Sequence, residues 1–307
     1  MSLNVGLVGL PGSGKTAVFR ALTGAPEGPY GKANVGVAEI PDGRVAQLAA
    51  IVGSAKATQA TMHVVDPPAL SPAALGELRQ VDALLGVSRG FGDDVDAQRD
   101  RESVELELLV ADRDHVERRL ERVRTSAKSG DPALRKEVEE LERLLEHVDG
   151  GGRLADYPGE LAAELEPLTT KSIVWLTNGG PGGIDFELET ELAGLSLEEA
   201  AEFRGGPPAL ESVRDSLFAE AGLITFFTAN ENEARAWTLR AGSTALEAAA
   251  SIHTDMARGF IRCEVVRFDD LVQAGSHAEA GRRGLQRLEG KTYVVGDGDV
   301  LTVRFNV

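Results

Sequence analysis

The residues with the clearest chemical potential form the run Gly9-Leu10-Pro11-Gly12-Ser13-Gly14-Lys15-Thr16, near the start of the 307-residue chain. Glycines at the Gly-x-x-x-x-Gly-Lys-Thr spacing tolerate positive φ angles, which lets backbone N–H groups surround phosphate oxygens. Lys15 would bring a positive charge to the β- and γ-phosphates, and the Thr16 hydroxyl would ligate Mg²⁺. The run therefore predicts a phosphate-binding loop, in preference to an accidental glycine turn.

The elements around this loop are those that a phosphate site needs. The apolar run Val5 to Val8 predicts a strand before the loop, and Ala17 to Leu22 predicts a helix after it, which places phosphate at a helix N-terminus. Alternation and apolar runs predict further elements: strands over Val35–Ile40, Thr61–Val65, Val81–Val87 and Ser172–Thr177, and a helix over Val45–Val52. This order predicts an α/β fold with a parallel sheet and the ligand at the carboxyl ends of its strands.

Two polar residues follow predicted strands. Asp66 ends the strand over Thr61–Val65, where a carboxylate could hold Mg²⁺ through water, although it could equally open the turn Asp66-Pro67-Pro68. Asn178 follows the strand over Ser172–Thr177, where a side chain that reads a purine could lie, but Asn-Gly-Gly-Pro is also a common turn composition. The residues alone leave both alternatives open.

Composition and charge restrict the classes of protein. The single cysteine, Cys263, permits no disulfide within the chain, and the five histidines show no paired spacing for zinc. No apolar stretch approaches the roughly 18 residues of a membrane span, and the first apolar run ends in the phosphate loop rather than in a cleavage site. We expect a cytoplasmic protein with no membrane partner and no DNA sequence specificity.

The net charge of −17 argues against a chain that coats nucleic acid by bulk electrostatics. The segment from Leu223 onward holds 10 Lys/Arg and 11 Asp/Glu, so almost all of the negative charge precedes it. Any contact with RNA is therefore expected from the C-terminal part. Seven arginines there could contact phosphate or simply be solvated: Arg235, Arg240, Arg258, Arg262, Arg282, Arg283 and Arg287.

The middle of the chain predicts a pair of helices. Apolar residues recur at coiled-coil intervals between Arg101 and Arg124, and again after the break Ser129-Gly130-Asp131-Pro132. Asp131 is a plausible N-cap, with Pro132 in the first turn. Two helices joined by so short a turn predict an antiparallel arm inserted into the sheet domain, either a spacer or a partner surface.

After Leu223 the pattern changes to short strands, over Leu223–Thr228, Ala234–Leu239, Phe260–Val266, Tyr293–Val295 and Val300–Val307. One helical segment, Thr244 to Ile252, is expected among them. We predict a small separate α+β domain. The expected division is 1–100 and 169–222 for the nucleotide-binding domain, 101–168 for the helical insertion and 223–307 for the last domain.

Several runs resemble the YchF-type, Obg-like ATPase family of P-loop proteins. They are Gly9 to Thr16, Asn34-Val35-Gly36-Val37, Ala111 to Arg122, Ala127 to Asp131, Leu223 to Thr228, Arg235-Ala236-Trp237-Thr238, His253-Thr254-Asp255, Arg258 to Arg262, Asp297-Gly298-Asp299 and Phe305-Asn306-Val307. The resemblance implies a Ras-like P-loop domain, an inserted antiparallel helical coiled coil and a C-terminal β-grasp domain of the TGS type. It also implies hydrolysis of ATP, often with GTP tolerated, with Mg²⁺ as cofactor, and the ribosome or ribosomal RNA as partner.

The motif and the resemblance together give the candidate site residues. Thr16 and Asp66 are expected to hold the metal, while Lys15 and Leu70 occupy catalytic positions, Leu70 where these proteins carry a hydrophobic residue near the place of a catalytic glutamine. The nucleotide is expected to contact Gly9, Pro11, Gly12, Ser13, Gly14, Lys15, Thr16, Ala17 and Asn178.

The chain departs from the family pattern where hydrolysis would occur. The family's Asp-x-x-Gly reads Asp66-Pro67-Pro68-Ala69, so the glycine whose N–H would meet the γ-phosphate is replaced, and the proline before it has no N–H to donate. The Asn-x-x-Glu element reads Asn178-Gly179-Gly180-Pro181 and lacks the acid, and no Ser or Thr lies between Thr23 and Ser54 to serve as the hydroxyl of a first switch. Two hypotheses follow: a slow NTPase that acts on the ribosome, or a hydrolysis-deficient adaptor that binds RNA or ribosomal protein.

Overall fold

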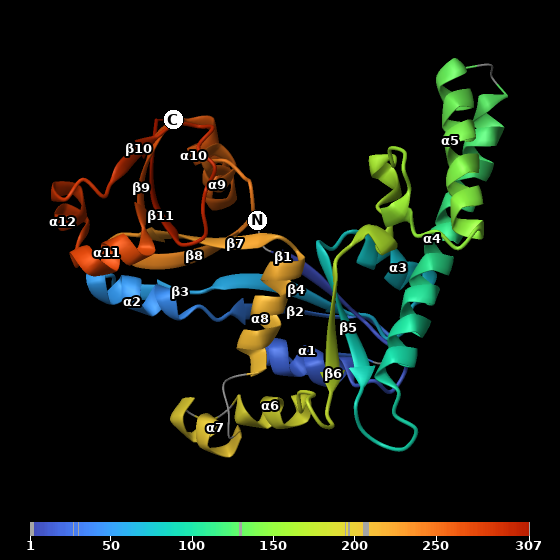
Figure 1. The fold of residues 1–307 in the computed structure, drawn as a ribbon, viewed down its shortest axis with the longest axis horizontal. Helices are drawn as coiled ribbons and strands as arrows, with labels where there is room; N and C mark the ends of the chain where they lie inside the picture. The colour runs from blue at the N-terminus through green and yellow to red at the C-terminus, as the bar shows by residue number, and fades with distance from the viewer. Residues whose placement is uncertain are drawn as a thin grey trace. The chain divides into compact units, whose positions relative to one another are not determined.

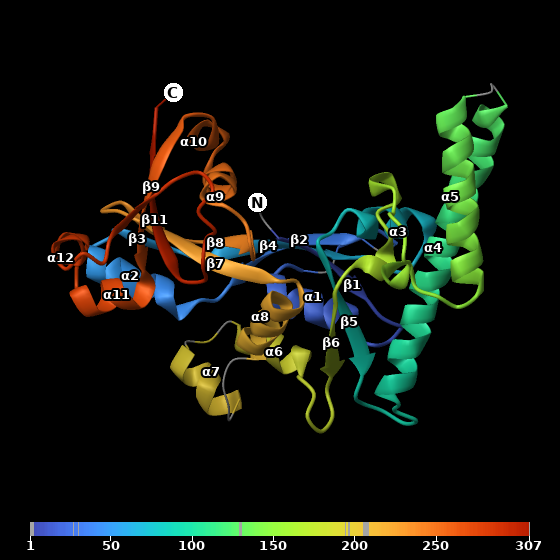
Figure 2. The ribbon, with the colours of Figure 1, turned by 45° about the horizontal axis from the view of Figure 1, so that its top comes forward.

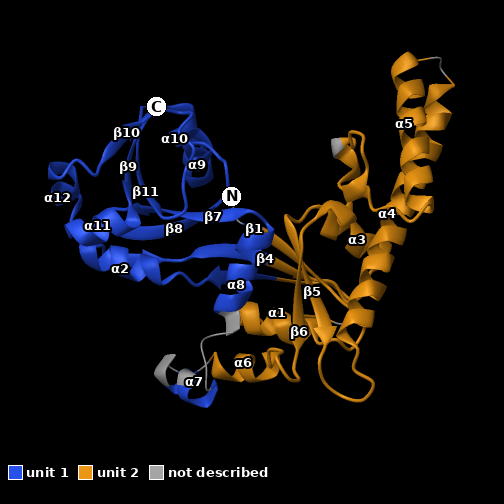
Figure 3. Ribbon diagram, viewed as in Figure 1, with its two compact units in different colours: residues 1–3, 36–63, 195–307 blue, residues 4–35, 64–194 orange. Residues whose placement is uncertain are grey.

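The computed structural model describes residues 3–26, 28–29, 31–128, 131–193, 195, 197–204 and 209–306. Contacts divide the chain into two compact units, shown in different colours in Figure 3. One unit comprises residues 4–35 and 64–194, and the other comprises residues 1–3, 36–63 and 195–307. Both units combine helices with strands, so the predicted α/β fold class is confirmed.

The first sheet contains the strand that leads into the phosphate loop. Its five strands lie in the order β2-β4-β1-β5-β6. Their bounds are β1 (Leu3–Val8), β2 (Asn34–Ile40), β4 (Ala60–Asp66), β5 (Ala83–Arg89) and β6 (Ile173–Asn178). The pairs β1–β5 and β5–β6 are parallel, as the sequence predicts. Strand β5 is buried along six of its seven residues, because a parallel strand is covered on both faces.

The helices of unit 2 in Figure 3, residues 4–35 and 64–194, follow strands of this sheet. They are α1 (Lys15–Thr23), α3 (Pro72–Arg79), α4 (Ala97–Ala127), α5 (Pro132–Asp149) and α6 (Phe186–Leu192), with short 3₁₀ turns η1 (Leu154–Asp156), η2 (Ala163–Leu165) and η3 (Leu168–Thr170). Val8, Leu78, Val104 and Leu108 form one apolar cluster, so β1, α3 and α4 share a core beside the loop.

Helices α4 and α5 form the predicted arm, and they lie side by side in two views (Figures 1 and 2). Their common core includes Val116, Leu120, Leu141 and Leu144. The Asp131 side chain accepts a hydrogen bond from the Ala133 N–H at 2.9 Å, which confirms the predicted N-cap. Helix α4 is longer than expected at both ends. Of the predicted break, Ser129 and Gly130 lie outside the described residues.

The second sheet combines distant parts of the sequence in the order β10-β9-β11-β7-β8-β3. Its strands are β3 (Lys56–Thr58), β7 (Leu223–Ala229), β8 (Glu233–Arg240), β9 (Phe260–Arg267), β10 (Arg287–Glu289) and β11 (Asp299–Phe305). Strand β3 pairs in parallel with β8, with Lys56 beside Glu233 and Thr58 beside Arg235. The sequence predicted that this domain begins at Leu223, so it did not predict that β3, from residues 56–58, adds a strand to its sheet.

Two details of the C-terminal prediction were wrong. Tyr293–Val295 is not a strand, since only an isolated bridge joins Val294 to Thr244. More than one helix follows Leu223: α9 (Ala245–Ile252), α10 (Thr254–Arg258), α11 (Phe268–Ala274) and α12 (His277–Arg282). The remaining helices of this unit are α2 (Gly43–Val52), α7 (Leu197–Arg204) and α8 (Ala209–Glu220). Among the helices of the described residues, none has the length and apolarity needed to cross a bilayer.

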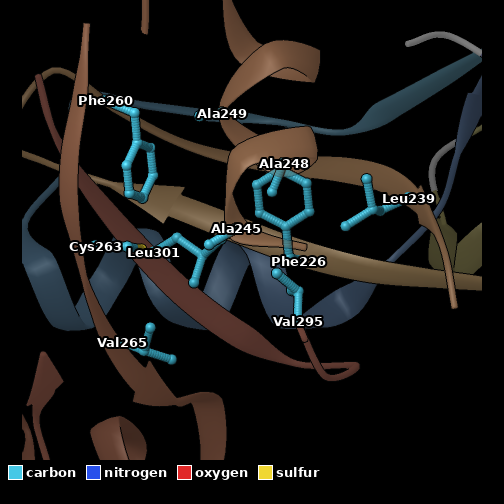
Figure 4. Packing of buried hydrophobic residues seen from close by; sticks show 10 residues of the cluster. All are labelled: Phe226, Leu239, Ala245, Ala248, Ala249, Phe260, Cys263, Val265, Val295 and Leu301. Carbon is cyan, nitrogen blue, oxygen red and sulfur yellow. The ribbon is translucent and has the colours of Figure 1, made fainter. Parts of the chain in front are cut away.

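The core of unit 1 in Figure 3, residues 1–3, 36–63 and 195–307, lies between α9 and the six-stranded sheet. Figure 4 shows Phe226, Phe260 and Leu301 gathered beneath the alanines of α9. Three alanines, Ala245, Ala248 and Ala249, are fully buried, because small side chains let the helix approach the strands closely. Cys263 belongs to the same cluster, and burial raises the pKa of its thiol to about 12. It is therefore a packing residue.

Candidate phosphate-binding site

The loop after β1 has the backbone conformation that the motif requires. Gly12 and Gly14 have φ angles of 80° and 90°, in the left-handed region that favours glycine. Gly14 is the N-cap of α1 and supplies no side-chain hydrogen bond to it, which leaves first-turn N–H groups of the helix open to an anion. A Cβ atom at Gly12 would meet nothing within 4 Å, so the loop is open on that side. Pro11 is exposed and Ala17 is half-buried in the first turn of α1.

Two other residues of the loop are tightly enclosed. A Cβ at Gly9 would lie 2.5 Å from the Val87 carbonyl oxygen and 2.8 Å from Ser13 Oγ, so only glycine fits there. Ser13 is 2% exposed, and its hydroxyl has no hydrogen-bond partner among the described residues. A buried hydroxyl without a hydrogen-bond partner is costly. Because Ser13 belongs to the phosphate loop, a phosphate oxygen bound there could accept the hydrogen bond of its hydroxyl.

Lys15 lies over the loop. Its Nζ donates to the carbonyl oxygens of Gly9 at 2.9 Å and Leu10 at 3.4 Å. Burial lowers the pKa of Lys15 below its usual value, while the carboxylates of Asp66 and Glu107 oppose that shift. A phosphate anion in the loop would compensate the same buried ammonium group.

Thr16 and Asp66 lie together, although 50 residues separate them in the sequence. Thr16 Oγ1 donates to Asp66 Oδ2 at 3.0 Å, and the Asn34 amide donates to the same oxygen at 2.9 Å. Asp66 is 2% exposed, so its carboxylate is directed inward. Hydroxyl and carboxylate oxygens are the hard ligands that Mg²⁺ prefers. The described part of the chain has no cluster of three His, Cys, Asp or Glu residues for a metal, so Mg²⁺ here would also need phosphate and water oxygens.

Asn178 both begins a turn and contacts the phosphate loop. Its side-chain amide donates to the Ser13 carbonyl oxygen at 3.2 Å. Gly179 and Gly180 have φ angles of 71° and 73°, and the Gly179 N–H returns to the Ile184 carbonyl oxygen at 2.7 Å. Because a Cβ at Gly14 would lie 1.9 Å from Asn178 Nδ2, the amide lies directly against the loop.

Leu70 is the apolar side chain among the candidate site residues that were assigned a catalytic position. It is half-buried and packs against the apolar cluster that includes Val8 and Leu78. Its side chain has no group that could polarise or deprotonate water. The structure therefore brings together Ser13, Lys15, Thr16, Asp66 and Asn178, while Leu70 is packed on the core beside them.

Asn34 is the polar residue of this cluster that was not among the candidate site residues. In the sequence, Asn34 appears only as the first residue of the run Asn34-Val35-Gly36-Val37 that resembles the family, directly before the strand predicted over Val35–Ile40. The contact to Asp66 forms because β2 and β4 are neighbours in the sheet, an order that the sequence does not state.

The fold and this loop define a P-loop protein of the α/β class. The C-terminal residues 223–306 match the family model YchF-GTPase_C, described as a protein of unknown function (DUF933). The chain is 36% identical to the ribosome-binding ATPase YchF of Bacillus subtilis (strain 168), with 100% of both chains covered. It is 31% identical to Obg-like ATPase 1 of Oryza sativa subsp. japonica, over 99% of this chain and 92% of that relative.

This chain belongs to the YchF family. The alignment to the Bacillus subtilis relative extends over 366 residues, more than the 307 of the chain, so the relative has segments that this chain lacks. The structure of the Schizosaccharomyces pombe YchF GTPase matches with a TM-score of 0.79 at 24% identity, over 99% of this chain and 98% of that one. That likeness supports the fold.

Proposed function

We propose that this chain binds ATP or GTP with Mg²⁺ through the loop Gly9 to Thr16. The observation that carries the proposal is the loop itself, with positive φ angles at Gly12 and Gly14 and an uncapped helix behind it. The nucleotide contacts are assigned to Gly9, Pro11, Gly12, Ser13, Gly14, Lys15, Thr16, Ala17 and Asn178. Titration calorimetry with each nucleotide and Mg²⁺ tests binding and measures the purine preference.

Each polar residue has a distinct role in this proposal. Lys15 would exchange its two carbonyl contacts for phosphate oxygens, and Thr16 and Asp66 would hold Mg²⁺, Asp66 through water. The metal would neutralise charge on the β- and γ-phosphates. Asn178 supports the loop from beneath, through the Ser13 carbonyl oxygen.

We propose that the chain is a slow NTPase. Pro68 lacks an N–H, Ala69 replaces the glycine of the family pattern, and Leu70 has no polar group to orient water. Alanine keeps a backbone N–H but does not reach positive φ angles as readily as glycine does, so the donor at this position would be aimed differently. One misplaced or missing preorganised donor can lower the rate by roughly a hundredfold or more. We expect a turnover below about 1 per second, measured as phosphate release under saturating nucleotide.

The control for this rate is the Lys15→Ala variant, which separates turnover at the loop from contaminating activity. A Lys15-dependent turnover well above about 1 per second would contradict the proposal. No turnover, with nucleotide binding retained, would favour the alternative function, a hydrolysis-deficient adaptor that binds RNA or ribosomal protein.

We also propose that the chain associates with the ribosome, because its Bacillus subtilis relative is named a ribosome-binding ATPase. The cytoplasm is the proposed location. Contact through the C-terminal arginines is the proposed mode, with the helical arm as a second surface. Several of these arginines already have carboxylate partners: Arg258 with Asp255, and both Arg282 and Arg283 with Glu279. Arg235 instead stacks on Trp237, with its guanidinium carbon 4.4 Å from the ring centre.

Point variants of the full chain are the appropriate test. A truncation near Gly222 would remove β8 and leave β3 without its partner strand. We expect a smaller fraction of the Arg235→Ala/Arg262→Ala double variant to pellet with ribosomes. The plot of its log binding constant against log salt concentration should also be less steep, by about one unit of slope for each lost phosphate contact.

The matched control is Arg282→Ala, because Arg282 already pairs with Glu279 at 2.6 Å. It is expected to pellet as the wild type does at every salt concentration. Equal pelleting of the double variant and the wild type would exclude binding led by these two arginines.

We propose the domain division 1–100, 101–168, 169–222 and 223–307, with a TGS-like β-grasp fold in the last segment. The family match that begins at residue 223 supports the last boundary. Strand β3 would then be an addition from the first segment to the sheet of the last. Limited proteolysis tests the last boundary: cleavage should occur first at the turn around Gly222, and early cuts within residues 223–306 would contradict it.

A further inference from the structure

The Asn34 side chain makes two directed hydrogen bonds. Its Nδ2 donates to Asp66 Oδ2 at 2.9 Å, and its Oδ1 accepts from the Gly28 N–H at 2.8 Å. One amide thus connects the carboxylate at the end of β4 to the segment that precedes β2. The amide is oriented by both bonds, since its donor and its acceptor cannot exchange places without losing them.

The contact with Asp66 is shared with the phosphate loop. Thr16 Oγ1 and Asn34 Nδ2 both donate to Oδ2 of Asp66, and the carboxylate is almost fully buried. Hydrogen bonds to a charged group are stronger than those between neutral groups, because the charge is only partly screened at a buried position. Asn34 is therefore placed to fix the orientation in which Asp66 faces Thr16.

The sequence explains why an amide matters at this position. No serine or threonine lies between Thr23 and Ser54, so this segment offers no serine or threonine hydroxyl for a metal ion. An amide oxygen is a weaker ligand than a carboxylate, and here it is already occupied by Gly28. Asn34 can act on Mg²⁺ through Asp66, as a residue behind a metal ligand.

We propose that Asn34 is a positioning residue for Mg²⁺: it holds the Asp66 carboxylate toward Thr16 and ties the backbone at Gly28 to that carboxylate. This inference rests on the proposed nucleotide site. Residues behind a metal ligand commonly change metal affinity by about 10–100-fold when they are removed. The nucleotide contacts of the loop itself do not involve Asn34.

The test compares nucleotide affinity with Mg²⁺ and with EDTA, for the wild type and for Asn34→Ala. In the wild type, Mg²⁺ should strengthen binding, so the Kd in EDTA exceeds the Kd in Mg²⁺. We expect the ratio of the Kd in EDTA to the Kd in Mg²⁺ to fall by about tenfold in Asn34→Ala, with the Kd in EDTA unchanged. Asn178→Ala should instead weaken binding in both conditions, because Asn178 supports the loop. Gln98→Ala, which removes an exposed amide from α4, is the neutral control.

A second measurement does not need nucleotide. Hydrogen exchange at the Gly28 amide should be faster in Asn34→Ala than in the wild type, because its acceptor is lost. Asn34→Ser, whose hydroxyl is too short to make both bonds, serves if the alanine variant folds poorly. If a folded variant has the same ratio of Kd in EDTA to Kd in Mg²⁺ as the wild type, the inference about Asn34 is wrong, while the proposed nucleotide binding still stands. A wild type that binds no nucleotide would remove the proposed function and this inference together.

Discussion

Lys15→Ala is expected to abolish measurable nucleotide binding while the fold is retained. Hydrogen bonds to charged groups contribute about 1.5–3 kcal/mol each, and Lys15 can make more than one with a triphosphate. The affinity should therefore fall by about a hundredfold or more. Titration calorimetry with Mg²⁺ and ATP or GTP measures the loss.

The matched control is Lys136→Ala, which removes an exposed lysine from the arm, where the Lys136 side chain is 78% exposed. It should bind nucleotide as the wild type does. Thermal unfolding of both variants excludes misfolding as the cause. Retention of wild-type affinity in Lys15→Ala would show that the ligand binds elsewhere.

Asp112→Ala is expected to be strongly destabilising. Asp112 is 1% exposed and pairs with Arg79 at 2.6 Å. It also accepts hydrogen bonds from the N–H groups of Leu168 and Thr169 and from the Thr169 hydroxyl. Its removal leaves the Arg79 guanidinium buried without a counter-charge, which typically lowers the free energy of unfolding by about 3–5 kcal/mol.

Chemical denaturation measures this change, and Asp149→Ala is its control. Asp149 also pairs with an arginine, Arg113 at 2.8 Å, but both side chains are substantially exposed. Such a surface pair contributes little to stability, because both charges remain solvated. If Asp112→Ala and Asp149→Ala lower the free energy of unfolding by similar amounts, the buried Arg79–Asp112 pair does not stabilise the fold as proposed.

The phosphate loop could be predicted from sequence because its signals are local. The apolar run, the glycine spacing and the following helix all lie within residues 5–22, and the structure has β1, the two positive φ angles and α1 there. The arm was predictable for the same reason: its apolar period and the Asp131-Pro132 cap are properties of adjacent residues.

Long-range pairings were not predictable in this way. Strand β3 has three residues, and its partner β8 is more than 170 residues away. Helices α11 and α12 have seven and six residues, too few for a periodic signal. Tyr293–Val295 has the composition of a strand, but the chain there turns and makes a single bridge.

In the candidate site, too, the local features could be predicted from sequence and the long-range contacts could not. Lys15 and Thr16 follow from the motif, whereas the contact of Asp66 with Asn34 depends on the order of strands in the sheet. For Asn178 the predicted turn is present, and its amide also contacts the phosphate loop, a contact that the sequence did not indicate. That Asn178 reads a purine stays a prediction.

Titration of the wild-type chain with ATP and with GTP, each in Mg²⁺ and in EDTA, tests the central claim most directly. The open loop, the Lys15 ammonium and the oxygens of Thr16 and Asp66 predict binding of at least one nucleotide, strengthened by Mg²⁺. Absence of Mg²⁺-dependent affinity for both nucleotides at millimolar concentration would contradict it.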